Sequence, residues 1–445
     1  MWLQAFGEDP EAKMSIYSTQ VSLLSYADIE CLLTDRAVEN VRLEFKRDMP
    51  EKEGLLKKIS SFANTYGGYI VLGVEQDTHA RAAALPGLEP TAGFGQKVIQ
   101  WCYDGIYPPL TPFVSSPIEG PAGEKRVFYV VYVPESHEAP HFLNGRRGCY
   151  IRTDEYGQRF EPHLATYEEI EHLANRRMRA IDLREGLIAR AGSRFKAHVN
   201  QAYHAKQNVI GEIDLTMRMA IIPAFPGQPI AIPVLERAVR GASLQARNEM
   251  FPLGKPSSQL DGFFFPDPRT INFGYLEIDR YGLIYYSEEM AYVKPESMPQ
   301  DETIRAAFEP APSDIYVYAT WILAWEMFYL KYAHLIYAAV GYEGPIQIRL
   351  GLDRIRGRQV RVPLGSSGRE FEEGTPLLDD SISIDRMVLS STLGGGLLDL
   401  SKDLFRAMTF SCGWVKAYSA PDEFIEFSVD SALAYLMWKR SDIAG

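Results

Sequence analysis

One helix followed at once by an apolar strand limits what the N-terminal part of this chain can fold into. Apolar residues recur at helical spacing between positions 55 and 66, Gly67 and Gly68 follow, and residues 69–74 form a continuous apolar run. Glycine can adopt the positive φ that closes a helix, and a run of this length is typical of a strand buried on both faces. The pattern predicts a helix packed on a central sheet strand.

A second strand is expected just before that helix, at residues 41–46. Val41, Leu43 and Phe45 alternate there with the charged Arg42, Glu44 and Lys46. Because side chains alternate between the two faces of a strand, one face is expected to be apolar and the other charged. The charged face is a candidate functional surface, although an ordinary solvated strand face with weak salt bridges would show the same pattern.

The rest of the chain alternates between helical and strand patterns, which predicts an α+β fold: an N-terminal α/β domain followed by a mixed α+β C-terminal domain. The helices are expected at 27–34, 94–103 and 166–177, the last with a Thr166/Glu169 capping box, and within the aromatic segment 315–340. The strands are expected at 126–133, 149–152 and 213–222, in a hairpin over 273–286, and at the start of 424–439, where a strand would lead into a helix.

The length of 445 residues is too great for one ordinary core, so two domains are expected. The predicted boundaries are an extension at 1–34, an N-terminal domain at 35–180, a helical linker at 181–205 and a C-terminal domain at 206–445. The aromatic residues of the second half are expected mostly in its core, with stacking on bases as the alternative. By analogy with other fusions, the C-terminal domain is expected to sense a ligand or mediate assembly.

The net charge of −12 argues against a protein that coats nucleic acid nonspecifically, so any such contact must be a local patch. The four cysteines are far apart and have no zinc or disulfide spacing, which favours a cytoplasmic location. The N-terminus does not resemble a signal peptide. Glu326, Lys331 and His334 interrupt the aromatic segment, so no membrane span is expected and a core or dimer-interface helix is favoured.

Two motifs associated with cofactors are not expected to function. The string from His137 to His141 has the spacing of a zinc-protease helix, but Pro140 prevents that helix, so no zinc is expected. A phosphate-binding loop ends in Gly-Lys-Ser/Thr, whereas the Gly254-Lys255 pair is followed by Pro256. No ATP is therefore expected.

Residues from about 35 to 177 resemble the Schlafen-type divergent Alba domain. The resemblance depends on ordered segments, namely the acidic opening at 39–46, the turn at 63–68, and the strings at 133–136, 140–141 and 149–152. It implies a small α/β domain that binds nucleic acid. For residues 200–445 we identify no resemblance.

The resemblance also implies a site. Glu39 and Glu44 match the first two acidic positions of nuclease relatives and Lys46 matches their basic position, but the third acidic position holds Gln76, so Asp77 is the nearest substitute. The implied catalytic set is Glu39, Glu44, Lys46 and Asp77, with Mg²⁺ or Mn²⁺ held by the three carboxylates and the scissile phosphate contacted by Lys46.

A wider basic surface is expected to contact the nucleic acid. Its candidate residues are Lys46, Arg47, Arg146, Arg147 and Arg152, although the arginines could equally be ordinary surface residues. The resemblance implies structured RNA such as tRNA rather than DNA, a role in phage defence or stress, and a homodimer or larger homo-oligomer. The alternative is a non-catalytic DNA-binding or transcriptional regulatory module whose C-terminal domain senses a signal or oligomerises.

Overall fold

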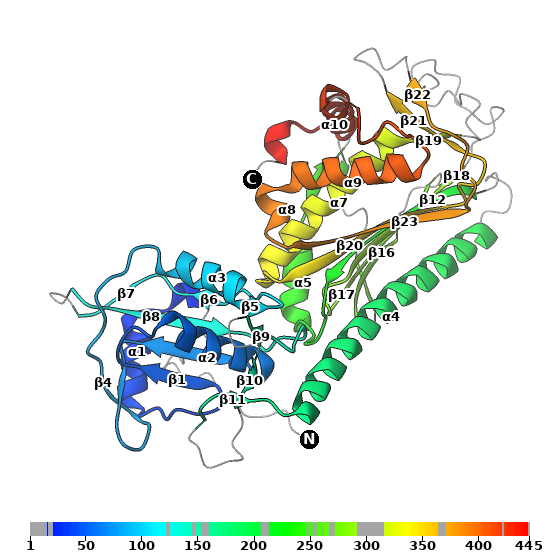
Figure 1. Ribbon diagram of the computed structural model, residues 1–445. Helices are drawn as coiled ribbons and strands as arrows, with labels where there is room; N and C mark the ends of the chain where they lie inside the picture. The colour runs from blue at the N-terminus through cyan, green and yellow to red at the C-terminus, as the bar shows by residue number, and fades with distance from the viewer. Residues whose placement is uncertain are drawn as a thin grey trace. The chain divides into compact units, whose positions relative to one another are not determined.

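The computed structural model divides the chain into two compact units, residues 1–179 (unit 1) and 180–445 (unit 2), and each is α+β (Figure 1). Each unit is described by itself. The structure describes residues 16, 21–121, 125–144, 148–152, 160–205, 213–246, 249–251, 256–259, 261–266, 272–291, 316–363, 371–420 and 422–443.

The main sheet of unit 1 places the predicted central strand, β2 (Gly68–Leu72), in its interior. β2 lies parallel to β1 (Leu43–Lys46) and antiparallel to β8 (Val127–Val133). Two short strands pair with the other side of β8, namely β6 (Phe113–Val114) and β7 (Ile118–Glu119). Ile70 and Val71 of β2 lie in different apolar clusters, which confirms burial on both faces.

Helices cover both faces of this sheet. α1 (Tyr26–Thr34) packs with Leu43, Phe45 and Val71 on one face. On the other, α2 (Lys52–Asn64) and α3 (Phe94–Gly105) pack with Ile70 and the inward side chains of β8. Apolar side chains on both faces of β2 and β8 therefore fix the three-layer order of unit 1.

The predicted glycine turn ends α2 for two physical reasons. Gly67 has a φ of +68°, which favours glycine. A Cβ atom at this position would also lie 2.6 Å from the backbone nitrogen of Glu135. The chain can therefore pass directly from α2 into β2 only with glycine at this point.

Smaller elements complete unit 1. A second sheet has the order β11-β10-β9-β5, and a separate hairpin joins β3 to β4. Their bounds are β3 (Glu75–Gln76), β4 (Ala82–Ala84), β5 (Ile106–Tyr107), β9 (Phe142–Leu143), β10 (Gly148–Ile151), β11 (His163–Leu164) and the short 3-10 helix η1 (Val21–Leu23).

The helix α4 (Tyr167–Ala205) is longer than predicted. It begins with the expected capping box, in which the Thr166 N–H donates to the Glu169 carboxylate (2.7 Å) and the Glu169 N–H to the Thr166 hydroxyl (3.3 Å). The expected end near residue 177 is wrong, because Leu187, Ala191 and Phe195 continue an apolar stripe that packs in unit 2. Residues 181–205, expected as a linker, are part of this helix.

Unit 2 is built on a seven-stranded antiparallel sheet with the order β15-β16-β17-β18-β12-β20-β23. The predicted hairpin is confirmed as β17 and β18, which turn at Tyr281 and Gly282. The strand bounds are β12 (Ile213–Pro223), β15 (Ser257–Gln259), β16 (Gly262–Pro266), β17 (Asn272–Asp279), β18 (Ile284–Ala291), β20 (Pro345–Asp353) and β23 (Ser381–Leu389).

The aromatic segment forms α7 (Ala319–Val340), which lies in the main core of unit 2 on the sheet face opposite α4 (Figure 1). None of the helices in the described part of the chain has the length and apolar character needed to cross a membrane. The remaining elements are α5 (Ile232–Gly241), α8 (Thr392–Gly395), α9 (Leu397–Ser411), α10 (Asp422–Leu436), β13 (Leu244–Ala246), β14 (Glu249–Phe251), β19 (Tyr316–Tyr318), β21 (Gln359–Pro363), β22 (Phe371–Glu373) and η4 (Arg440–Asp442).

One predicted strand in this unit is wrong. The segment 424–439 was expected to start as a strand, but α10 already begins at Asp422. Its buried residues Ile425, Val429 and Leu433 lie four apart and face the core, so helical packing decides a pattern that also permits a strand.

Candidate functional site

The charged residues of β1 meet in a buried ion-pair cluster. Glu44 pairs with Lys46 (2.7 Å), with Lys58 of α2, and with Arg152 just after β10 (2.6 Å). We call Glu44, Lys46, Lys58 and Arg152 the Glu44 cluster. The alternative of an ordinary solvated strand face is therefore wrong for Glu44, whose side chain is only 3% exposed.

Arg152 is held from three directions. Its N–H donates to the Thr65 hydroxyl (2.9 Å) and its guanidinium donates to the Asn40 carbonyl (3.3 Å). The guanidinium also lies 4.4 Å from the centroid of the Phe62 ring. Arg152 was expected on a phosphate-binding surface, but it is buried, so in this structure it positions Glu44 instead.

The electrostatics of the cluster keep Glu44 ionised. Burial alone would raise the pKa of this carboxyl, but Arg152, Lys58 and Lys46 together lower it to about 2. Burial acts in the opposite direction on Lys46, yet attraction to Glu44 raises the pKa of its ammonium group above the usual value. Both groups therefore remain charged at neutral pH.

The second predicted carboxylate, Glu39, lies near Glu44 but is used by the backbone. One of its oxygens accepts a hydrogen bond from the Phe45 N–H (2.6 Å). Burial and then repulsion from Glu44 raise the pKa of Glu39. The structure thus brings these two carboxylates close together, as expected, but gives Glu39 a role in anchoring β1.

The third predicted carboxylate, Asp77, lies in the exposed turn between β3 and β4. It accepts hydrogen bonds from the N–H groups of Arg81 (3.0 Å) and His79 (2.7 Å), which lower its pKa. Within the described residues, no three His, Cys, Asp or Glu side chains gather as a possible metal site. The expected set of Glu39, Glu44 and Asp77 is therefore not assembled.

The residues present do not fit a Mg²⁺ or Mn²⁺ ion. Such an ion takes oxygen ligands from carboxylates and water. The Glu44 oxygens instead face two ammonium groups and a guanidinium, and a divalent ion there would be repelled by all three. This donor set suits an anion near Lys46 and Lys58 better than it suits a metal.

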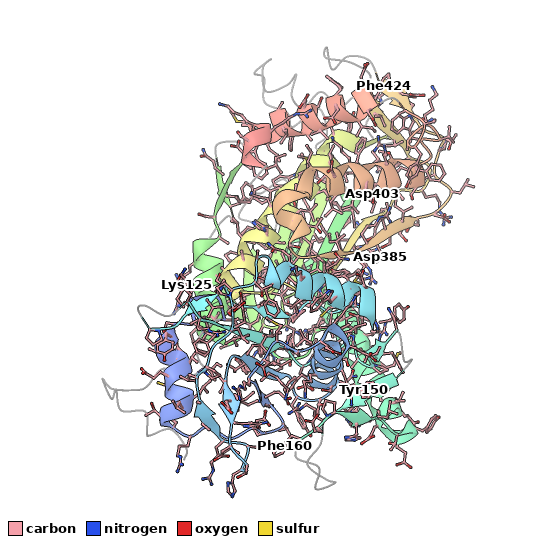
Figure 2. All side chains as sticks on the ribbon, turned by 60° about the vertical axis from the view of Figure 1, so that its left-hand side comes forward. Lys125, Tyr150, Phe160, Asp385, Asp403 and Phe424 are labelled. Carbon is pink, nitrogen blue, oxygen red and sulfur yellow. The ribbon has the colours of Figure 1, made fainter. Side chains whose placement is uncertain are left out.

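Two cations of the cluster reach the surface. The Lys46 side chain is 27% exposed and that of Lys58 is 11% exposed. Lys58 also lies 3.4 Å from Glu161, whose carboxylate is 61% exposed. Tyr150 lies two residues before Arg152, and Phe160 directly precedes Glu161. Both lie apart from Lys125 in the view of Figure 2.

The remaining predicted contacts have separate outcomes. Arg47 is exposed and pairs with the exposed Glu75 (3.1 Å). Arg146 and Arg147 lie outside the described residues. His141, expected to be structural, interacts through its two ring nitrogens with the Pro108 carbonyl and the Ser136 hydroxyl (both 2.7 Å), and burial lowers its pKa to about 4.

Reasoning from the sequence missed several residues that build the site. Lys58 is three positions after Leu55 and four before Phe62, so a lysine on the apolar stripe of a helix was an available signal. Asn64 bonds to the Tyr150 carbonyl (2.8 Å) and to the backbone of His141, and Arg176 donates to the last carbonyls of α2. No local pattern predicts these long-range bonds.

Residues 39–161 match the protein-family model described as Schlafen, AlbA_2. The N-terminal part of the chain therefore contains an AlbA_2-type domain, which indicates nucleic-acid binding. Comparison with curated proteins gave no match. The match covers β1, α2, β2 and the whole Glu44 cluster.

Proposed function

We propose that unit 1 binds the phosphate backbone of a nucleic acid at the exposed side of the Glu44 cluster, and that it does so without a bound metal ion. The observation that carries this proposal is the convergence of three cations on one buried carboxylate, with Lys46 and Lys58 partly exposed. The family match supports the nucleic acid as the ligand class.

The cluster has an excess of positive charge. Within the cluster, three cations surround the single carboxylate of Glu44, while the exposed Glu161 pairs with Lys58 from outside the cluster. Glu44 also fixes the ammonium groups before any ligand arrives, so less side-chain entropy is lost when a phosphate binds. A phosphate oxygen beside Lys46 and Lys58 would accept charge-assisted hydrogen bonds.

Binding without cleavage corresponds to the alternative of a non-catalytic nucleic-acid-binding module. The cations around Glu44 favour it, because they suit a phosphate better than a metal ion. We also propose that the ligand is structured RNA rather than DNA and that two copies of the chain associate. Both points depend on the family resemblance. A metal-dependent ribonuclease would instead require the carboxylates to leave their present partners.

The test measures binding of the full chain to fluorescently labelled tRNA and single-stranded DNA, in EDTA and in Mn²⁺, over a range of salt concentrations. We expect binding in EDTA, tighter for the RNA, with affinity that falls as salt increases because phosphate contacts release counterions. Lys46→Gln is expected to weaken binding and to reduce the salt dependence by roughly one phosphate contact.

Lys125→Gln is the matched control, because Lys125 is an exposed lysine of unit 1 that does not belong to the Glu44 cluster. It should bind as the unaltered protein does. An equal loss of affinity in Lys46→Gln and Lys125→Gln would refute a local binding site. It would show only that binding depends on the overall charge of the protein. Cleavage in Mn²⁺ that stops in EDTA would refute the metal-free proposal and restore the nuclease.

A further inference from the structure

Three aromatic side chains form a row across the main sheet of unit 1. Tyr69 of β2 is the cross-strand neighbour of Tyr132 of β8, which is in turn the neighbour of Phe113 of β6. The ring centroids are 4.6 Å apart for Tyr69 and Tyr132 and 5.9 Å apart for Tyr132 and Phe113, and both pairs are stacked. We call Phe113, Tyr132 and Tyr69 the aromatic row.

The row lies on the α1 side of the sheet, beside the core rather than within it. Tyr69 packs at the margin of the cluster that contains α1, whereas Val114, the next residue after Phe113, packs toward α3. All three aromatic side chains are partly exposed. Aromatic side chains that only fill the core would be as fully buried as Phe128, which is 1% exposed.

A cation and a fourth ring extend the row at the start of β2. The Tyr69 N–H donates to the Arg42 carbonyl (2.8 Å), so the two residues are adjacent. The exposed Arg42 side chain places its guanidinium 5.9 Å from the centroid of the Tyr66 ring, and Tyr66 is 54% exposed. Burial raises the pKa of the Tyr132 hydroxyl, and the positive charge of Arg42 offsets this in part.

We propose that the aromatic row, together with Tyr66 and Arg42, is a second contact surface that stacks on unpaired bases of a single-stranded nucleic acid. Partly exposed rings beside a cation are the combination that single-strand binders use, because each base has a π-face and each nucleotide carries a phosphate. This inference rests on the proposed function and adds base stacking to its phosphate contacts.

The test compares two labelled strands of equal length, an oligothymidylate and an abasic oligonucleotide with the same phosphates. The full chain is expected to bind the oligothymidylate more tightly. Tyr66→Ala and Phe113→Leu should each weaken that binding roughly 5-fold or more, as expected for the loss of one stacked base, and should leave abasic binding unchanged.

Tyr103→Ala is the matched control, since Tyr103 is an exposed tyrosine of α3, on the other side of the sheet. It should bind both strands as the unaltered protein does. Circular dichroism of each variant checks that unit 1 remains folded, and Tyr66→Ala is the variant least able to disturb the core because its ring is exposed.

The outcomes separate this inference from the proposed function. Equal affinity for the two strands, unchanged in Tyr66→Ala and Phe113→Leu, would overturn base stacking, while a loss of abasic binding in Lys46→Gln would still support the phosphate site. Failure of both strands and of tRNA to bind would overturn both.

Discussion

Each unit of this protein buries a glutamate in its core, and the two carboxyls have opposite properties. Glu44 of unit 1 pairs with three cations, which lower its pKa to about 2. Glu326 of unit 2 lies in the middle of α7 with no exposed surface, and within the described residues no ion pair reaches it. Burial raises its pKa well above the usual value, and the nearby Ser401 hydroxyl offsets this only in part.

The difference shows that burial does not determine the charge of a carboxyl by itself. The desolvation penalty favours the neutral acid in both units. In unit 1 three cations offset that penalty and place ammonium groups near the surface. In unit 2 the aromatic core around Glu326 provides no such cations within the described residues, so the penalty raises the pKa of its carboxyl. The arrangement in unit 1 is the one expected of a binding site.

Removing the carboxylate of unit 1 should have the largest effect on stability. Glu44→Ala leaves Arg152 and Lys58 buried without their counter-ion, so we expect unit 1 to lose about 3–5 kcal/mol of stability. Urea denaturation of the full chain measures the loss, and hydrogen exchange of the β1 and β2 amides assigns it to unit 1.

Glu75→Ala is the control for that change, because Glu75 forms an exposed pair with Arg47 in the same unit. Its loss should be below about 1 kcal/mol. Similar losses in the two variants would show that the Glu44 cluster is no more than a surface ion pair.

Acid should weaken the unit 1 cluster next. The pKa of Glu44 is lower in the folded state than the ordinary value of 4.5, so its contribution is complete above that pH and is lost as the pH falls toward about 2. The full contribution is about 3 kcal/mol. In urea denaturation, the stability difference between the unaltered protein and Glu44→Gln should narrow from pH 6 to about pH 3, and a constant difference would contradict the lowered pKa.

The sequence was sufficient to predict the main helix and strands of unit 1, but only some of the contacts in its candidate site. The helical spacing in α2 and the apolar run of β2 depend on short-range patterns, so both elements were predictable. Alternation in β1 correctly placed Glu44 opposite Leu43 and Phe45, but it could not show that α2 and the segment after β10 cover that face. Lys58 and Arg152 come from distant parts of the chain, and their pairing with Glu44 is a property of the tertiary fold.

Replacing the buried acid of unit 2 should have the opposite sign to the change in unit 1. Glu326→Leu removes a polar group from the core at similar volume, so we expect a gain of about 1–3 kcal/mol at pH 7. The pKa of Glu326 is raised in the folded state, so its penalty grows as the pH rises above 4.5, and the gain should be smaller at pH 4.

Urea denaturation at both pH values measures this, and Glu423→Leu, at an exposed position in the first turn of α10, is the control, with an expected change within about 0.5 kcal/mol. Destabilisation by Glu326→Leu would mean that the carboxyl forms essential polar contacts. Glu44 and Glu326 would then differ in the groups that they contact rather than in their charge.

The smallest stability effect is expected at Glu161, where the two roles of the Glu44 cluster separate. Glu161 is 61% exposed and lies 3.4 Å from Lys58, so Glu161→Gln should change stability by less than about 0.5 kcal/mol. The same change removes a negative charge beside the proposed phosphate site, so it should tighten tRNA binding at low salt, with a smaller gain at high salt because of screening. Fluorescence polarisation with tRNA measures the effect. Unchanged or weaker binding would mean that phosphates do not approach Lys58, because the nearby carboxylate of Glu161 would repel a phosphate bound there.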